Sequence, residues 1–187
     1  MKFQEQFKKK MIPELAKELK VKNQHAVPRI EKVKINVSIG SYLAGSKDYS
    51  QVVKNVTDIT GQKPLVTLSR KAISNFKLKI GMPVGITVTL RKKKMYDFLS
   101  KLINIVFPRT RDFRGLSARS FDGHGNYSLG IAEYTVFPEI HPEDVTKNHG
   151  VEVTIVTTSK NNENAYKLLK TMGFPFKKDE NLPRSKK

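Results

Sequence analysis

An alternation of apolar and polar residues over 33–39 places the strongest constraint on the fold of this chain. Every second residue from Val33 to Ile39 is apolar, and the residues between them are polar. A strand turns successive side chains to opposite faces, so this pattern predicts a β-strand with one buried face and one open face. Gly40 follows directly and is predicted to end the strand.

Other segments of the chain show either the same alternation or the period of a helix. Strands are predicted over 65–69, 86–91 and 151–158, and helices over 3–19, 48–60, 94–106 and 163–172. Gly61, Pro108 and Gly173 are predicted to end three of the helices. Because strands and helices come in mixed order, we expect an α+β fold with an antiparallel-rich sheet that carries helices on one face.

The size and composition of the chain indicate one soluble domain. Its 187 residues, 38% of them hydrophobic, can bury a proper core. We expect a single domain over 1–178 and a charged, disordered tail over 179–187. No apolar run is long enough to span a membrane, and the absence of cysteine excludes disulfides and thiolate metal sites.

The start of the chain lacks the apolar region of a signal peptide. It is basic and amphipathic, as a mitochondrial presequence would be. Glu5, Glu14 and Glu18 argue against that alternative, because such presequences are poor in acids. We therefore expect a cytoplasmic protein.

Positive charge is concentrated in one part of the sequence. The net charge is +18, and residues 62–119 hold fourteen Lys or Arg against two Asp, a net +12. Residues 120–176 hold four Lys against seven acids, a net −3. Charge needed only for solubility would not be segregated in this way, so nucleic acid is the leading class of partner.

The segment 109–130 combines cations, aromatic rings and glycines. Its arginines are Arg109, Arg111, Arg114 and Arg119, with Phe113 and Phe121 between and after them. A guanidinium binds phosphate through two hydrogen bonds and stacks on bases, which a lysine ammonium does not do. This composition favours a nucleic-acid contact.

The polar positions of the first three predicted strands share one chemistry. They are Lys34, Asn36, Ser38, Thr67, Ser69, Thr87, Thr89 and Arg91. Short hydroxyls and amides on a rigid surface can contact a ribose 2′-hydroxyl or a base edge, while neighbouring cations attract phosphate. The alternative interpretation is that threonine is present only because it favours β-structure.

Several motifs make the chain similar to a known family. They are VKINVSIG at 33–40, TGQKP at 60–64, GITVTLR at 85–91, FPRTRDFRGL at 107–116 and FPEI at 137–140. These motifs resemble the bacterial-type L-five family of large-subunit ribosomal proteins, and the resemblance covers about residues 1–178. It implies a structural protein that anchors 5S rRNA in the central protuberance and lies beside 23S rRNA and neighbouring large-subunit proteins.

The resemblance also implies roles for three groups of residues. The sheet face opposite the helices and its rim are expected to bind 5S rRNA through Lys34, Asn36, Ser38, Gln62, Lys63, Thr67, Ser69, Thr87, Thr89 and Arg91. A long basic loop over 70–85 is expected near the peptidyl-site tRNA, with Lys71, Ser74, Asn75, Phe76, Lys77 and Lys79. A bridge to a basic small-subunit head protein, or further RNA, is expected at Arg109, Arg111, Arg114, Glu139, Glu143 and Asp144.

Two features around the loop add further expectations. Its apolar residues, Ile73, Phe76, Leu78 and Ile80, predict that it packs in part against its own core. Relatives often have a glycine after the arginine of the third strand, whereas three lysines at 92–94 follow Arg91 here. That run adds charge that could reach further RNA.

Catalysis is not expected from this sequence. It contains no HExxH metal motif and no GxxxxGK(S/T) phosphate loop, and the glycines at 123–130 do not connect a strand to a helix. We expect no cofactor and no metal. The alternatives from other functional classes are a non-specific basic DNA-binding protein and an enzyme that acts on RNA.

Overall fold

The computed structural model describes residues 3–21, 23–40, 49–140 and 148–177. They fall into two compact units. Unit 1 takes its residues from the stretches up to 33, over 90–129 and from 154 onward, and unit 2 from 34–89 and 130–153. The single domain expected over 1–178 stays a prediction, and the tail expected over 179–187 lies outside the described residues.

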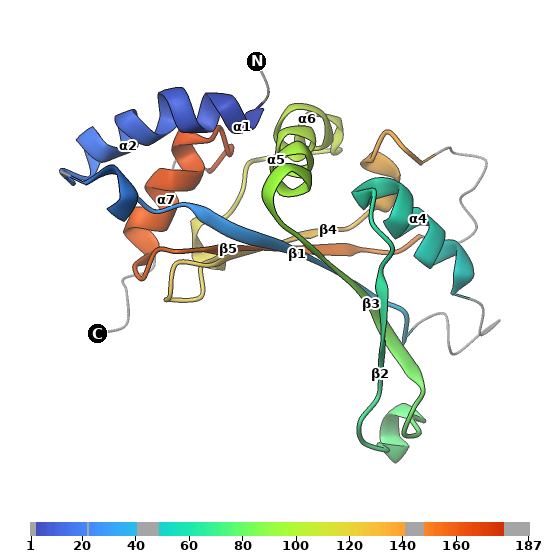
Figure 1. The fold of residues 1–187 in the computed structure, drawn as a ribbon. Coiled ribbons are helices and arrows are strands. Elements are labelled where there is room, and N and C mark those ends of the chain that lie inside the picture. The colour runs from blue at the N-terminus through green and yellow to red at the C-terminus, as the bar shows by residue number, and fades with distance from the viewer. Residues whose placement is uncertain (1–2, 22, 41–48, 141–147, 178–187) are drawn as a thin grey trace. The chain divides into compact units, whose positions relative to one another are not determined.

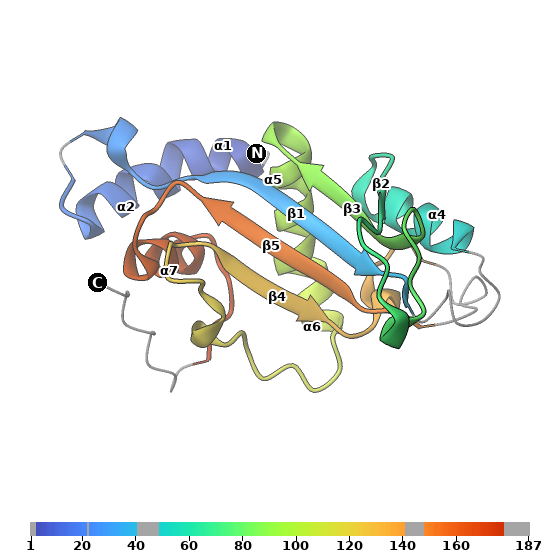
Figure 2. The same ribbon diagram turned by 90° about the horizontal axis from the view of Figure 1, so that it is seen from below.

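The described residues form an antiparallel sheet of five strands with the order β2-β3-β1-β5-β4 (Figure 2). The strands are β1 Ile30–Ser38, β2 Leu65–Leu68, β3 Pro83–Leu90, β4 Tyr127–Ile131 and β5 Val151–Thr157. The strand predicted at 33–39 therefore begins three residues earlier, at Ile30. Together with the helices, this sheet confirms the α+β class.

Strand β4 is the one element of the sheet that the sequence analysis did not predict. Tyr127, Leu129 and Ile131 are buried and alternate with exposed Ser128 and Gly130. The surrounding glycines, which disfavour regular strands, hide this short alternation.

The helices of unit 1 lie on one face of its strand segments (Figure 1). They are α1 Phe3–Gln6, α2 Ile12–Glu18, α5 Lys92–Lys101, α6 Phe107–Arg109 and α7 Asn162–Thr171, with 3-10 turns at Gln24–Ala26 and Ala118–Ser120. Their apolar stripes are buried through Phe7, Leu15, Met95, Leu99, Leu102, Val106, Leu168 and Leu169. Phe7 also contacts Tyr96, with ring centroids 5.5 Å apart.

Two π-helical turns in unit 1 each come just before a proline. Phe7–Met11 precedes Pro13, and Leu102–Val106 precedes Pro108. Proline lacks an N–H and its ring crowds the carbonyl four residues back, which a wider turn relieves. Pro108 was predicted to end the helix, which is wrong: it lies in the first turn of α6, where proline is tolerated.

Unit 2 packs helix α4 Ser50–Thr60 on one face of its strands (Figure 1). Val52, Val56 and Ile59 of α4 are buried, as are the inward residues Ile35, Val37, Ile39, Ile86 and Val88. Gly61 ends the helix with a φ of 63°, and its N–H donates to the Thr57 carbonyl, as glycine does at this position. A 3-10 turn, Tyr134–Val136, precedes the segment that leads toward β5.

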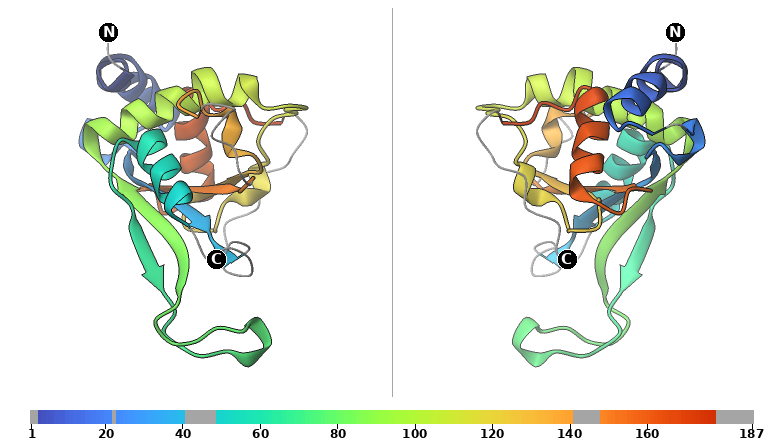
Figure 3. Two further views of the ribbon diagram at one scale, coloured as in Figure 1. Left: turned by 90° about the vertical axis from the view of Figure 1, so that its right-hand side faces the viewer. Right: turned by 90° about the vertical axis from the view of Figure 1, so that its left-hand side faces the viewer.

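The loop between β2 and β3 is the long basic loop expected over 70–85, although its last three residues lie in β3. It holds a 3-10 turn, Ser74–Phe76, closed by a bridge between Ile73 and Leu78. The side chains of Phe76 and Ile80 are 73% and 72% exposed, so the expected packing of this loop against its own core is wrong for them. The hairpin carries the loop away from α4 (Figure 3).

Candidate nucleic-acid interface

The strands of unit 2 turn a polar surface away from α4, which we name the open face. It consists of Lys34, Asn36, Ser38, Thr67, Thr87, Thr89 and Glu152. Buried apolar residues alternate with these side chains along β1, β3 and β5, whereas β2 has no buried residue and adds the exposed Leu65 to the face. The register places Thr67 opposite Gly85 and Leu65 opposite Thr87. The structure therefore brings most of the predicted 5S rRNA residues onto one surface.

Gly85 creates a bare backbone position in the middle of the open face. A Cβ atom there would lie 3.1 Å from Thr67 Oγ1, 3.3 Å from the Val37 carbonyl oxygen and 3.8 Å from Asn36 Oδ1. An added Cβ would crowd Thr67 Oγ1 and the Val37 carbonyl oxygen, and it would only touch Asn36 Oδ1. The glycine, which is itself buried, thus lets the Thr67 side chain and the β1 backbone approach the β3 backbone closely.

Two hydroxyl groups of the open face, those of Thr67 and Thr87, donate their protons to the protein backbone. Thr67 Oγ1 donates to the Gly85 carbonyl at 2.9 Å, and Thr87 Oγ1 donates to the Ile35 carbonyl at 3.1 Å. A hydroxyl has one proton and two lone pairs, so these oxygens keep only acceptor capacity toward a ligand. At the rim, Gln62 Nε2 donates to the Thr89 carbonyl at 3.4 Å and Ser69 Oγ to the Lys71 carbonyl at 2.7 Å.

The amide of Asn36 is oriented by a carboxylate on the neighbouring strand. Its Nδ2 donates to Glu152 Oε2 at 3.2 Å, while its Oδ1 points toward the Gly85 position. Asn36 Oδ1, Thr67 Oγ1 and Thr87 Oγ1 therefore all present lone pairs. Glu152 was not among the predicted site residues, although its polar position in the alternating segment 151–158 could have indicated it.

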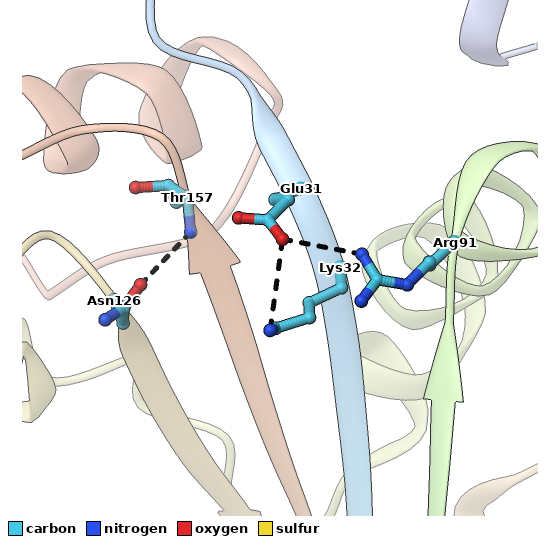
Figure 4. A network of polar contacts seen from close by, with 5 residues as sticks. All are labelled: Glu31, Lys32, Arg91, Asn126 and Thr157. Carbon is cyan, nitrogen blue, oxygen red and sulfur yellow. Dashed lines mark hydrogen bonds and ion pairs between the residues drawn. The ribbon is translucent and has the colours of Figure 1, made fainter.

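The cations predicted beside this face differ in their surroundings. Lys34 and Lys63 of unit 2 are exposed. Arg91 belongs to unit 1, where its Nη1 lies 3.4 Å from Glu31 Oε1, and Lys32 Nζ lies 3.9 Å from the same oxygen (Figure 4). Exposed ion pairs contribute little stability, so phosphate can replace Glu31 as the partner of Arg91.

The residues predicted near tRNA gather at the end of the β2–β3 hairpin. They are Lys71, Ser74, Asn75, Phe76, Lys77 and Lys79, and all six are exposed. Lys77 has a φ of 51°, in the left-handed region, and its N–H closes the 3-10 turn by donating to the Ser74 carbonyl. The aromatic ring and the cations thus share one small projecting surface.

The arginine segment of unit 1 is held by a rigid frame. Phe113 stacks on Phe107 with centroids 5.3 Å apart, and the Leu116 N–H donates to the Pro175 carbonyl at 2.7 Å. The Tyr127 hydroxyl donates to the Ser117 carbonyl at 2.9 Å. The four side chains that this frame carries, Arg109, Arg111, Arg114 and Arg119, are all exposed.

The acidic residues predicted to share a bridge with these arginines stay a prediction. Glu139 is half-buried in unit 2. Glu143 and Asp144 lie outside the described residues.

A tight polar turn precedes β4 in unit 1. Asp122 accepts hydrogen bonds from the His124 N–H at 2.8 Å and from the Asn126 side-chain amide at 2.6 Å. Burial raises the pKa of Asp122, but these hydrogen bonds outweigh it and lower the pKa below its ordinary value. Asn126 Oδ1 in turn accepts from the Thr157 N–H at 3.2 Å, which ties the turn to β5 (Figure 4).

His149 is a buried titratable residue of unit 2. Its ring stacks on Tyr134 with centroids 3.9 Å apart and planes at 3°. Burial lowers the pKa of His149, and a hydrogen bond with the Gly150 backbone opposes that shift in part.

We expect the free energy of unfolding to decrease as the pH falls below the ordinary histidine pKa of 6.5. Above that pH both states are neutral at His149, and below it the unfolded chain binds a proton that the folded chain resists. Urea unfolding between about pH 5 and pH 8 measures the effect. His149→Phe should remove this pH dependence of the free energy of unfolding. His25→Gln, at an exposed histidine, should leave it in place. An unchanged pH dependence in His149→Phe would contradict the assignment to His149.

The described residues contain no cluster of three or more His, Cys, Asp or Glu side chains that could hold a metal ion. Among the same residues, no helix has the length and apolar character needed to cross a membrane.

Both halves of the chain match profiles of one protein family. A family profile described as "Ribosomal protein L5" matches residues 23–79, and a second profile, for the C-terminus of the same ribosomal protein family, matches residues 83–176. The "Large ribosomal subunit protein uL5" of Thermotoga maritima is 50% identical over 177 residues, which cover 93% of this chain and 95% of that protein.

Relatives from other bacterial groups agree with that match. The same-named protein of Halothermothrix orenii is 50% identical over 172 residues, covering 92% of this chain and 96% of its own length. The same-named protein of Trichodesmium erythraeum is 47% identical over 169 residues, which cover 90% of this chain and 93% of that protein.

These similarities confirm what the sequence motifs predicted about the class of protein. Large-subunit ribosomal proteins are structural rather than enzymatic, and bacterial ribosomes are cytoplasmic. The chain belongs to the ribosomal protein L5 family and is a structural constituent of the large ribosomal subunit.

Proposed function

We propose that the chain binds 5S rRNA through the open face of unit 2 and helps to anchor that RNA in the central protuberance. The observation that carries this proposal is the row of oriented acceptors, Asn36 Oδ1, Thr67 Oγ1 and Thr87 Oγ1. Acceptors do not bind phosphate oxygens, which are acceptors themselves. They bind the N–H groups of bases and the 2′-hydroxyl, the group that distinguishes RNA from DNA.

The cations supply the sequence-independent part of the binding free energy. Lys34, Lys63 and Arg91 are exposed and can neutralise phosphates, which releases condensed counterions. The acceptors are held before binding, Thr67 and Thr87 by backbone carbonyls and Asn36 by Glu152, so little side-chain entropy is lost when RNA arrives. The acceptor residues are therefore proposed to recognise the bases and riboses, and the cations to attract the phosphates.

The hairpin loop is proposed to contact the peptidyl-site tRNA. Phe76 is exposed among Lys71, Lys77 and Lys79, and an aromatic ring flanked by cations is suited to stack on a base or ribose while the cations hold the backbone. The loop's place at the end of a hairpin gives it the reach for a partner outside the subunit's own RNA.

The arginine segment is proposed to contact 23S rRNA or a neighbouring large-subunit protein. The bridge to a basic small-subunit head protein is proposed for the acidic segment that includes Glu139, Glu143 and Asp144. Opposite charges across such a contact chiefly aid encounter and orientation. The exposed, framed Arg109, Arg111 and Arg114 have the phosphate-binding geometry that guanidinium groups supply.

A competition assay distinguishes this proposal from non-specific binding to polyanions. We expect 5S rRNA to compete far better than unrelated RNA of equal length or duplex DNA at cellular ionic strength. If about six phosphates are neutralised, the log–log dependence of affinity on salt should have a slope of about −4 to −5. Filter binding or fluorescence anisotropy measures both quantities.

Equal competition by all three nucleic acids would contradict the proposal and support the alternative of a non-specific basic DNA-binding protein. The slope alone does not decide between them, because both involve phosphate contacts. The ratio of affinities is therefore the decisive quantity.

A further inference from the structure

A hollow opens on unit 2 beside the acceptor row. Its cavity volume is about 430 Å³, and its lining comes from the end of β1 and from the adjoining parts of β4 and β5. Asn36, Ser38, Gly130, Ala132, Gly150 and Glu152 contribute most of that lining. A hollow of this volume falls in the range of sites that hold small planar molecules.

Small residues keep the hollow open. A Cβ atom built on Gly130 would meet no atom within 4 Å, so the space above this residue is empty. Gly150 brings its backbone close to that of β4, because a Cβ atom there would lie 3.3 Å from the Ile131 carbonyl oxygen. A flat ring can therefore lie directly over the backbone at this point.

The charge at the hollow is opposite to that of the chain as a whole. Glu152 is exposed at its edge, in a protein with a net charge of +18. A carboxylate repels phosphate, so on a surface for RNA it fits only a group that donates hydrogen bonds. One of its oxygens already accepts from Asn36 Nδ2 at 3.2 Å, which fixes the carboxylate while leaving acceptor sites on both oxygens.

We propose that this hollow receives one unpaired guanine of 5S rRNA, read by the Glu152 carboxylate. The Watson–Crick edge of guanine presents N1–H and the N2 amino group side by side, and two adjacent donors match the two oxygens of a carboxylate. This inference rests on the proposed binding of 5S rRNA and specifies one contact within it.

The other bases fit the carboxylate less well. Adenine and cytosine place a ring nitrogen acceptor beside their amino group, and uracil places its single N–H between two carbonyl oxygens. Each would bring a lone pair against a Glu152 oxygen, and two acceptors that face each other without a donor repel. An arginine of a neighbouring protein also offers two donors, but the hollow is continuous with Asn36 and Ser38 of the open face.

Kethoxal footprinting of 5S rRNA tests the proposal, because kethoxal reacts with the N1 and N2 atoms of unpaired guanines. We expect one guanine to be protected by the wild-type chain and to stay reactive with Glu152→Gln, while the rest of the footprint persists. The affinity of Glu152→Gln should fall about tenfold, although its net charge rises by one unit.

Glu163→Gln is the matched control, since Glu163 is exposed on α7 and its replacement changes the charge equally. It should keep both the protection and the affinity. Gly130→Val, which fills the hollow, should abolish the protection as Glu152→Gln does. Inosine at the protected position lacks the N2 amino group and should weaken binding of the wild type but not of Glu152→Gln.

The outcomes separate this inference from the function on which it rests. If the chain gives a specific footprint on 5S rRNA but Glu152→Gln changes the protection of no guanine, the guanine site is overturned and 5S rRNA binding is retained. The Glu152 carboxylate would then accept hydrogen bonds from a protein donor. A chain that gives no specific footprint on 5S rRNA overturns both.

Discussion

Gly125→Ala is expected to lower the free energy of unfolding by about 3 kcal/mol, which corresponds to a loss of roughly 6–12 °C in Tm. Gly125 has a φ of 83°, where an L residue is strained, and a Cβ atom would lie 2.7 Å from the Ser159 carbonyl oxygen. The neighbouring backbone cannot retreat easily. The Gly125 N–H donates to buried Asn162 Oδ1 at 3.2 Å, and its carbonyl accepts from Thr157 Oγ1 at 2.7 Å.

Two other glycines provide graded controls for this effect. Gly123 has a φ of 95°, but a Cβ atom added there would meet no atom within 4 Å, so Gly123→Ala should show only the strain of the left-handed conformation, about 1–2 kcal/mol. Gly130 has neither feature, and Gly130→Ala should be close to neutral. Urea unfolding followed by circular dichroism measures all three variants, and equal losses at Gly125 and Gly123 would show that the contact with Ser159 is unimportant.

The triple variant Asn36→Ala, Thr67→Val, Thr87→Val is expected to bind 5S rRNA about 100-fold more weakly. Each substitution removes one oriented acceptor, and a hydrogen bond of this kind contributes about 1 kcal/mol. Valine keeps the branched shape and β-propensity of threonine, so the Tm should change by only a few degrees. Electrophoretic mobility shift with 5S rRNA and thermal unfolding of the same samples measure the two effects.

The matched control removes the same type of hydrogen bond elsewhere. Thr57 and Thr171 each donate from Oγ1 to a helical carbonyl, at 2.7 Å and 2.9 Å. The double variant Thr57→Val, Thr171→Val should therefore retain full affinity. If it loses affinity as the triple variant does, the acceptor row is not the recognition surface.

Periodicity predicted those elements whose burial is regular. The alternation from Val33 to Ile39 and the helical stripe of α4 are both confirmed by the burial of their apolar residues. Strand β4 escaped prediction because glycines interrupt its pattern. The exposure of Phe76 and Ile80 could not be predicted either. The sequence of a loop does not show whether its apolar residues are close enough to the core to pack against it.

The candidate site was predictable only in part, because local alternation gives the face of a strand but not the contacts between distant residues. Alternation placed Asn36 and Thr87 at non-core positions of their strands, which the structure confirms, while their role with RNA stays a prediction. The bonds that turn these side chains into acceptors join distant parts of the chain: Asn36 meets Glu152, and Thr87 meets Ile35. Such pairings depend on sheet order and register, which no local pattern encodes.

Strand β2 lies at the margin of the sheet, and this placement bears on how the chain survives before it joins a ribosome. An unpaired strand border invites another chain to add to it, and Leu65 and Leu68 are 68% and 59% exposed there. The strand is only four residues long, its register shifts between Thr67 and Leu68, and Lys63 and Lys71 flank it. A short strand, an irregular register and flanking charge are features that hinder the addition of another chain to such a border, and they oppose the attraction of the two exposed leucines.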